Sequence, residues 1–287
     1  MFLSTVFFSA SDVLGKYLIA DYPLAVVTWL RSVLGLIMLL MFAQATNQAR
    51  SYRTRYPRWH LFRSCLSIFL LPAIFYSLNH IPLAEFIAII FAAPFFIAIL
   101  TPLLLKERVA GTAWLAIIIG FCGILIITRP TPDHFRLAHL TALFCAAATA
   151  ALSVTARRLS GTDSLFALNV YLYPASILVF SVPAIMDWRS PSPLDWLLFT
   201  ALGFTATAAL WCVILAVKNA RPAVVAPIDY IRMIWTIAVG WLFWNEIPDS
   251  FSWIGIMIIT ACGLYIVTQG RREQASPPVA KLDDEFD

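Results

Sequence analysis

The sequence consists largely of apolar runs, each long enough to form a helix across a lipid bilayer. A transmembrane helix needs about 20 mostly apolar residues, with a range of about 17–25. A β-barrel would instead need alternating strands of about ten residues, and the runs here are longer and continuously apolar. The sequence therefore predicts an all-α integral membrane protein with ten transmembrane helices. The ten runs are 2–19, 24–43, 61–79, 83–105, 112–128, 137–156, 165–185, 195–217, 222–244 and 251–268.

Composition supports the same prediction. Hydrophobic residues make up 61% of the 287 residues and charged residues 13%, whereas a soluble protein carries roughly 25% charged residues. A chain with so few charges cannot cover itself in polar surface, so we expect most of its surface to face lipid. The five cysteines lie singly within apolar runs, which indicates packing residues rather than a disulfide framework or a metal site.

The two ends of the chain differ in character. Residues 1–10 are already apolar, with no basic segment or small-residue cleavage site ahead of a polar chain. We therefore interpret them as the start of the first transmembrane helix rather than as a signal peptide. Residues 271–287 are polar and end in an acidic sequence, which predicts a disordered tail.

Lys and Arg are distributed unevenly between the connections. Of the 20 in the chain, 14 lie after the even-numbered predicted helices or in the tail, and three lie after the odd-numbered ones. The remaining three, Lys16, Arg31 and Arg232, fall within predicted helices. Because cytoplasmic connections carry the excess of positive charge, we expect a multi-pass protein of the bacterial inner (plasma) membrane with both termini in the cytoplasm.

A segment of the first half recurs in the second half. Each copy carries an Ala-Pro pair, then a lone carboxylate, a Trp seven residues later and a Gly within the next apolar run. Repeated landmarks at a steady spacing indicate an internal duplication. Four of the landmark pairs are offset by 139 or 140 residues: Pro82 and Pro222, Glu107 and Glu246, Trp114 and Trp253, Gly123 and Gly263.

The duplication has a consequence for topology, because five helices per copy is an odd number. Residues 1–130 would form the first repeat, and residues 131–270 a second repeat that enters the membrane inverted. The charges agree, since the connection 79–81 has no Lys or Arg and its counterpart 218–221 has two. Inverted repeats are typical of secondary transporters, with the binding site near the membrane midplane between the halves. The alternative is a duplicated structural membrane protein without a transport pathway.

Several of these motifs resemble the EamA-type drug/metabolite transporter family. The resemblance runs from about residue 1 to 270 and is closest to the YddG-type exporters of aromatic amino acids. It implies a central cavity lined by helices 1–4 and 6–9, with helices 5 and 10 bracing them outside. One departure is Asn245, where the family often has Gly. The motifs that carry the resemblance are Arg31, Ala93-Pro94 ahead of Lys106-Glu107-Arg108, and Ala-Pro-Ile-Asp-Tyr at 226–230 ahead of Asn245-Glu246.

Charged residues within the membrane are costly and are usually paired or functional. Asp12 and Lys16 are four positions apart and Asp229 and Arg232 three apart, so each pair could form on one helix face. Three carboxylates are candidates for proton or cation coupling, namely Asp12, Glu85 and Asp229. Glu107 and Glu246 lie at predicted membrane edges, where we expect each to complement the N-terminus of the following helix.

Aromatic and polar residues placed deep in the runs, or at their ends, are candidates for binding a substrate. Aromatic faces suit planar or cationic groups through stacking and cation–π contact, although packing against lipid is the plain alternative for any one ring. The candidates are Tyr76, Asn79, His80, Phe91, Phe95, Tyr171, Trp211, Tyr230, Arg232 and Trp235.

Proline is the third signal within the apolar runs. A helix-interior proline removes a backbone hydrogen bond and kinks the helix, and the matched pair Pro94 and Pro227 is the best candidate for a hinge or gate. The prolines in predicted helices are Pro72, Pro94, Pro102, Pro174, Pro183 and Pro227.

These features predict a monomeric transporter that exports aromatic or other amphipathic amino acids by alternating access. The alternative substrates are cationic drugs or other small metabolites, which deep carboxylates would favour. The sequence contains no zinc-protease, serine-hydrolase or nucleotide-binding motif, so neither an enzyme nor a nucleotide-driven pump is expected. We expect a small-molecule substrate and membrane lipids as partners, with no nucleic acid, cofactor, metal or catalytic residue.

Overall fold

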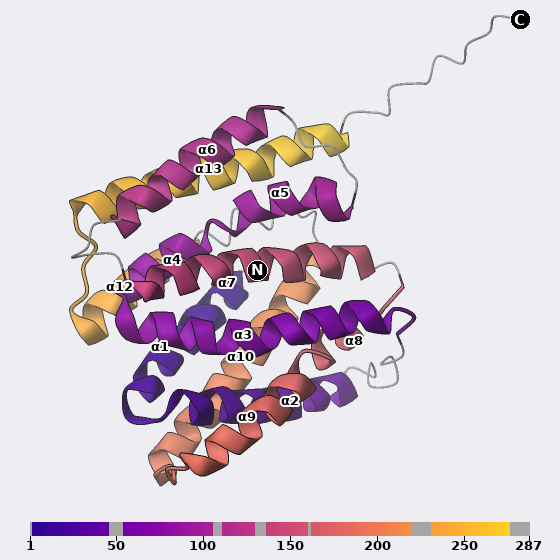
Figure 1. Ribbon diagram of the computed structural model, residues 1–287, viewed down its shortest axis with the longest axis vertical. Coiled ribbons are helices and arrows are strands. Elements are labelled where there is room, and N and C mark those ends of the chain that lie inside the picture. The colour runs from indigo at the N-terminus through magenta and orange to yellow at the C-terminus, as the bar shows by residue number, and fades with distance from the viewer. Residues whose placement is uncertain are drawn as a thin grey trace, which may run out of the picture.

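The computed structural model describes residues 2–45, 54–105, 111–129, 136–159, 162–219 and 231–275 as a bundle of α-helices without strands in those ranges (Figure 1). The helices coincide with the predicted apolar runs, because helices satisfy their own backbone hydrogen bonds away from water. They are α1 (Phe2–Asp21), α2 (Leu24–Ala45), α3 (Pro57–His80), α4 (Leu83–Ile90), α5 (Ala93–Leu104), α6 (Gly111–Thr128), α7 (Leu137–Leu159), α8 (Leu165–Val170), α9 (Tyr173–Met186), α10 (Pro193–Asn219), α12 (Ile231–Trp244) and α13 (Ser250–Ala275).

Seven of the described spans are long and apolar enough to cross a membrane, with α4 and α5 taken together as one span and α8 and α9 as another. Two further helices are apolar but shorter, at Trp114–Thr128 and Ser250–Ile266. The prediction of an all-helical protein with membrane-spanning helices is therefore confirmed for the described residues, and the number of ten helices in two repeats stays a prediction. The predicted run 222–244 lies partly outside the described residues, and its described part is α12.

Two predicted helices are interrupted just before a proline. The break between α4 and α5 falls at Phe91 and Ala92, where the amide of Ala92 donates to the carbonyl of Ile89, 3.0 Å away, in a tighter turn than an α-helix. Pro94 then lies in the first turn of α5, where its missing N–H costs nothing. The break between α8 and α9 has the same form, with Pro174 in the first turn of α9.

Polar side chains of α3 satisfy the carbonyl groups that the second break leaves free. The hydroxyl of Ser64 donates to the carbonyl oxygen of Tyr171 at 2.5 Å, and the hydroxyl of Ser67 donates to that of Leu172 at 2.9 Å. Serine side chains on a neighbouring helix are a known way to keep a proline break within the membrane.

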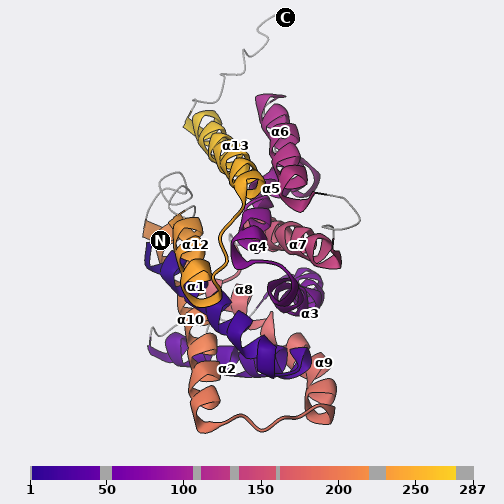
Figure 2. The same cartoon turned by 90° about the vertical axis from the view of Figure 1, so that its left-hand side faces the viewer.

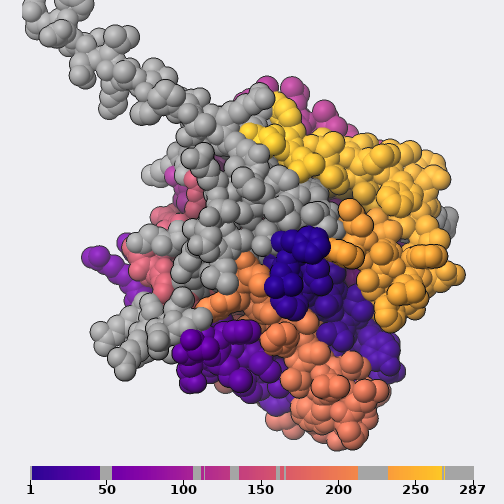
Figure 3. Space-filling model, turned by 180° about the vertical axis from the view of Figure 1, so that it is seen from behind, coloured from indigo at the N-terminus to yellow at the C-terminus, as the bar shows by residue number. Residues whose placement is uncertain are grey.

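The two halves of the chain interlock rather than lying side by side as separate bundles. α1 packs against α10 and α12, while α3 packs against α7 and α9. α2 lies between α9 and α10 at the lower end of the molecule in Figure 1. Seen from behind (Figure 3), the N-terminal end of α1 reaches the surface among segments of the second half, and the ring of Phe2 lies 6.0 Å from that of Trp235.

The helices α6 and α13 form a pair at the opposite end of the molecule from α2 and α9 (Figures 1 and 2). They cross at glycines. A Cβ atom on Gly255 would lie 2.7 Å from the carbonyl oxygen of Gly123 and 2.4 Å from the side chain of Ile127. Small residues let membrane helices approach this closely, and the position of the pair fits the bracing role that the resemblance implied.

Candidate functional site

The connections α1–α2, α3–α4, α9–α10 and α12–α13 lie at one end of the bundle, on the left in Figure 1. We call it the Glu246 end, after the carboxylate between α12 and α13. At this end, Oε1 of Glu246 lies 2.5 Å from Nζ of Lys16, and the two side chains are 23% and 9% exposed. Its other oxygen, Oε2, accepts a hydrogen bond of 2.9 Å from the backbone N–H of Leu83. One carboxylate thus ties α1 and α4 to the second half of the chain.

Glu246 differs in one respect from its predicted role. It was expected to complement the following helix, α13, but it caps the N-terminus of α4 instead. Asp249 caps the N-terminus of α13, because its Oδ1 accepts a hydrogen bond of 3.0 Å from the backbone N–H of Ser252. Asn245 has a positive φ of 54°, a conformation that Asn tolerates better than most residues. The turn therefore forms without the glycine that the family often has.

A second ion pair lies deeper along α1. Arg232 of α12 donates to the carboxylate of Asp12, and both side chains are largely buried. The guanidinium carbon of Arg232 also lies 4.9 Å from the centre of the Phe8 ring. The prediction that Asp12 pairs with Lys16 within one helix is wrong, since both residues instead pair with the second half. Sequence spacing shows only neighbours on one helix, whereas these long basic side chains reach across to another.

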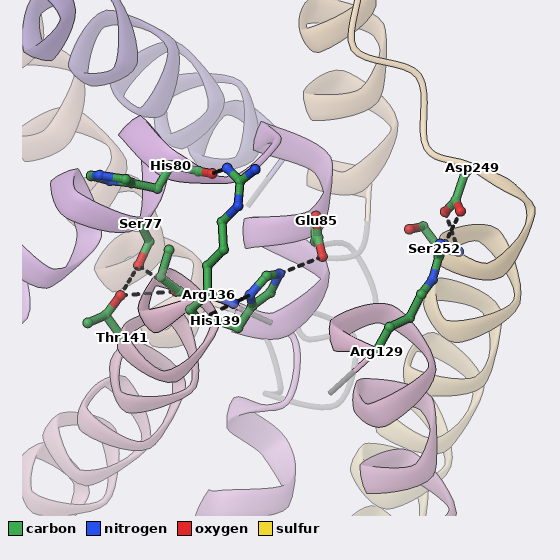
Figure 4. A network of polar contacts seen from close by, with 10 residues as sticks. Ser77, His80, Glu85, Arg129, Arg136, His139, Thr141, Asp249 and Ser252 are labelled. Carbon is green, nitrogen blue, oxygen red and sulfur yellow. Dashed lines mark hydrogen bonds and ion pairs between the residues drawn. The ribbon is translucent and has the colours of Figure 1, made fainter. Parts of the chain in front are cut away.

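A third contact between the halves joins α4 to α7 (Figure 4). Nε2 of His139 lies 2.9 Å from Oε1 of Glu85, and Nδ1 of His139 lies 3.0 Å from the backbone N–H of Arg136. Because that N–H must donate, Nδ1 accepts, and the protonated Nε2 donates a hydrogen bond to Oε1 of Glu85. The guanidinium of Arg136 donates to the carbonyl oxygen of His80 at 3.0 Å.

Two cavities lie at the Glu246 end. The larger, of about 390 Å³, is lined by residues that include Glu85, Arg136 and His139. The smaller, of about 330 Å³, is lined by residues that include Lys16 and Asn79. Both are bordered by His80 and by Glu246, so the polar contacts between the halves also form the walls of these spaces.

Near the middle of α2, Arg31 lies among aromatic rings. Its guanidinium carbon is 5.8 Å from the centre of the Phe75 ring, and the side chain is half-buried. Arg31 is also within electrostatic reach of Asp12 and Tyr173. It was noted in the sequence as a charge within a helix but not as a site residue, because the sequence does not show that Phe75 and Tyr173 approach it.

The remaining predicted site residues fall into four groups, of which the last consists of packed aromatic rings. Tyr76 stacks on His80 with ring centres 4.2 Å apart, so these two lie with Asn79 at the Glu246 end. Trp235 is on α12 with Arg232, at the surface beside Phe2. Tyr230, Pro227 and Asp229 lie outside the described residues.

The other predicted rings are placed elsewhere. Phe91 and Phe95 are buried in the hydrophobic core, and Phe95 fills the space beside Gly120, where a Cβ atom would be 2.1 Å from its ring. Tyr171 lies at the α8–α9 break, with its ring 4.5 Å from that of His60. Trp211 stacks on Phe42 at 5.8 Å. These contacts are those of packing residues, and none of them joins these rings to Arg232 or Asp12.

The opposite end of the bundle has its own polar contacts. Oδ2 of Asp163 accepts a hydrogen bond of 2.6 Å from the hydroxyl of Thr54 and lies 2.7 Å from Nε2 of His60. Burial would raise the pKa of Asp163, but the hydrogen bonds from Thr54 and His60 outweigh burial and hold the pKa below its ordinary value. The carboxylate is therefore ionised at neutral pH and fastens the connection before α8 to the start of α3.

Comparison with known proteins gives a consistent result over nearly the whole chain. The model of the EamA-like transporter family matches residues 1–129 and 136–269. A riboflavin transporter of Vibrio cholerae is 28% identical over 262 residues, which cover 88% of this chain and 87% of that protein. The pseudopaline exporter CntI of Pseudomonas aeruginosa is 27% identical over 264 residues, covering 91% and 92%.

Two further matches agree with this result. An S-adenosylmethionine uptake transporter of Rickettsia prowazekii is 24% identical over 274 residues, covering 96% of this chain and 93% of that protein. A solved crystal structure aligns with a TM-score of 0.63 at 18% identity, covering 95% of this chain and 99% of the other, so the two share a fold. The named relatives do not single out the exporters of aromatic amino acids that the sequence resemblance favoured.

Proposed function

Since this chain belongs to the EamA-like transporter family, we propose that it is a secondary transporter that moves a small amphipathic solute by alternating access between two inverted repeats. The observation that carries the proposal is the ion pair between Asp12 and Arg232, which joins the two halves within the helical part of the molecule. Charged groups at such a depth are kept for substrates, coupling ions or mutual pairing.

The packing of the helices supports the two repeats. If residues 1–130 and 131–270 are equivalent, α1 corresponds to α7, α3 to α10, and the α4–α5 helix to α12. Exchanging the repeats then turns the contact between α1 and α10 into the contact between α7 and α3, and both are present. It likewise turns the contact between α5 and α7 into the contact between α12 and α1, and both are present. The contact of α6 with α13 is its own equivalent. Such an exchange is what two inverted repeats related by a pseudo-two-fold axis would give.

The polar contacts at the Glu246 end supply the elements of a gate. The bonds Lys16–Glu246 and Glu85–His139 each join the first half to the second. Opening the bundle at this end would require these bonds to break. If the connections rich in Lys and Arg are cytoplasmic, as the charge distribution favours, this end faces outside, and the protein in this state is closed toward the outside.

Aromatic or other amphipathic amino acids are the solutes we propose first. A zwitterion carries one ammonium and one carboxylate, which suit a site that contains both a carboxylate, Asp12, and a guanidinium, Arg232, and Phe8 and Phe75 supply ring faces nearby. Efflux of cationic drugs is less well supported, because Arg232 already neutralises Asp12. The relatives that carry riboflavin and S-adenosylmethionine favour a second candidate class, heteroaromatic metabolites.

The test is counterflow of labelled Phe, Trp or Tyr into liposomes that contain the purified full chain, with riboflavin as a second solute. Saturable flux that is inhibited by excess unlabelled solute would support the proposal. Measuring the same flux with and without a pH gradient shows whether transport is coupled to protons. The candidate coupling groups are Asp12, Glu85 and Asp229. Absence of saturable flux for all four solutes would contradict the proposed substrate class. We expect flux from monomers, with membrane lipid as the only other partner.

A further inference from the structure

Arg31 differs from three other basic side chains of the described helices that are largely buried. Lys16 and Arg232 each pair with a carboxylate, and Arg63 donates to backbone carbonyls and a hydroxyl. Arg31 makes no hydrogen bond or ion pair with any residue in the described part of the chain. An unpaired guanidinium at this depth is costly, so a partner that arrives from outside the protein would be bound favourably.

The surroundings of Arg31 are aromatic because two glycines make room for the rings. A Cβ atom on Gly15 would lie 2.6 Å from the Phe75 ring, and one on Gly35 would lie 2.9 Å from the Tyr173 ring. Gly35 is one turn beyond Arg31 on α2, so both positions share a helix face. Phe75 therefore approaches Arg31 from α3 and Tyr173 approaches the same face from α9.

The described charges near Arg31 do not compensate it. Among the described residues, Asp12 is the carboxylate within electrostatic reach of Arg31, but its Oδ2 is already bonded to Arg232. Among these three described residues, two are cations and one is an anion. A solute that brings one carboxylate would balance the group.

We propose that Arg31 binds the carboxylate of the transported solute while the rings of Phe75 and Tyr173 contact its aromatic part. A guanidinium can hold a carboxylate through two parallel hydrogen bonds, and ring faces add stacking contact. This inference rests on the proposed transport function and makes it more specific, because it requires an anionic group on the solute. A cation with the same ring is excluded from this subsite by the charge of Arg31.

Three ligands with one ring system test the subsite: tryptophan, indole-3-propionate, which lacks the ammonium, and tryptamine, which lacks the carboxylate. The readout is the rise in unfolding temperature of the purified full chain in detergent as each ligand is titrated, since a ligand that binds the folded state stabilises it. We expect tryptophan and indole-3-propionate to stabilise the wild-type protein, and tryptamine to require a concentration at least roughly tenfold higher.

The variants are Arg31→Gln and Arg31→Lys. We expect Arg31→Gln to bind both carboxylates on the order of 10- to 100-fold more weakly, the range for losing a hydrogen bond to a charged group, with tryptamine binding unchanged or improved. Arg31→Lys should recover part of the affinity. If Arg31 has only a structural role, Arg31→Gln should instead weaken the binding of all three ligands equally.

Two results would overturn the proposal: no stabilisation of the wild type by indole-3-propionate, or equal stabilisation of the wild type and Arg31→Gln by it. Flux measurements on the same preparations distinguish failure of the proposed subsite from failure of the proposed transport function. Carboxylate binding that depends on Arg31 without any saturable flux would leave the subsite standing and contradict transport. Flux of tryptophan that Arg31→Gln leaves intact would support transport and remove the subsite.

Discussion

The ammonium of Lys16 lies 2.5 Å from the carboxylate of Glu246, although 230 residues separate them in the sequence. The same carboxylate caps the first residue of α4, Leu83. The pair therefore holds three elements together at one end of the bundle. Because Lys16 is only 9% exposed, little water can solvate its ammonium group if the carboxylate of Glu246 is removed.

The variant Glu246→Gln tests this arrangement. The amide keeps the shape and can still accept from Leu83, but it leaves the ammonium of Lys16 buried without a counter-charge. We expect the free energy of unfolding to fall by about 1–3 kcal/mol, measured by thermal unfolding in detergent. The matched control is Asp249→Asn, which breaks the more exposed pair of Asp249 with Arg129 and should cost less than about 1 kcal/mol. Equal losses in the two variants would contradict this account of burial.

The pair Asp12–Arg232 should behave as a unit. We expect Asp12→Asn and Arg232→Gln each to reduce counterflow at least roughly tenfold, because each leaves one partly buried charge unpaired. The double variant should lose less than the product of the two effects, with a coupling of about 1–3 kcal/mol. Independent, multiplicative losses would show that the two residues act separately.

Asp163 gives a prediction for the dependence of stability on pH. Its pKa is lowered in the folded protein, so its ionised carboxylate stabilises the fold at pH values above the ordinary Asp pKa. That contribution is lost as the pH falls through the lowered pKa. We expect Asp163→Asn to cost about 1–3 kcal/mol at pH 7, with the difference from wild type shrinking below about pH 4.

The measurement is thermal unfolding of both proteins between pH 7 and pH 3. Asp187→Asn is the control, because Asp187 is an exposed carboxylate at the end of α9 and its loss should change stability by less than about 0.5 kcal/mol. A constant difference between wild type and Asp163→Asn down to pH 3 would count against the ionised form as the stabilising species.

The crossing of α6 and α13 gives a prediction about packing. Alanine at Gly255 would place a Cβ atom 2.7 Å from the backbone oxygen of Gly123, and backbone cannot move aside cheaply. We expect Gly255→Ala to destabilise the protein by about 1–3 kcal/mol. Gly240→Ala is the control, because the nearest atom to its Cβ would be 3.7 Å away, and it should be neutral or stabilising by up to about 1 kcal/mol. A neutral Gly255→Ala would argue against the close crossing.

Much of the fold followed from local features of the sequence. The apolar runs predicted the helices. The prolines predicted kinks, and Pro94 and Pro174 do lie at the two breaks, whereas Pro72, Pro102 and Pro183 lie inside continuous helices. The partners of Lys16 and Asp12 could not be predicted in the same way. They depend on how α1 lies against α12, and a spacing of four residues pointed to a pair within one helix instead.

The candidate site was predicted less completely. Arg232 and Asp12 were recognised as charges within apolar runs, and the structure pairs them. His139 was not among the predicted site residues, yet it is buried against Glu85. Phe95 looked suitable for binding a ring, but the space beside it comes from Gly120 on α6, and no spacing within α5 reveals that packing. The surroundings of Arg31 were missed for the same reason, since Gly15 and Gly35 make room for rings that come from other helices.

The central claim is that the Glu246 end opens as the halves move apart, and a distance measurement tests it most directly. Spin labels on the exposed positions Ala20 of the first half and Ile247 of the second half report on opening, after replacement of the native cysteines. A second pair on the bracing helices, at Ile118 and Met257, is the control. We expect transported solute to add a longer distance between Ala20 and Ile247 while the control distance stays unchanged. A single unaltered distance between Ala20 and Ile247, in protein that catalyses flux, would contradict alternating access at this end.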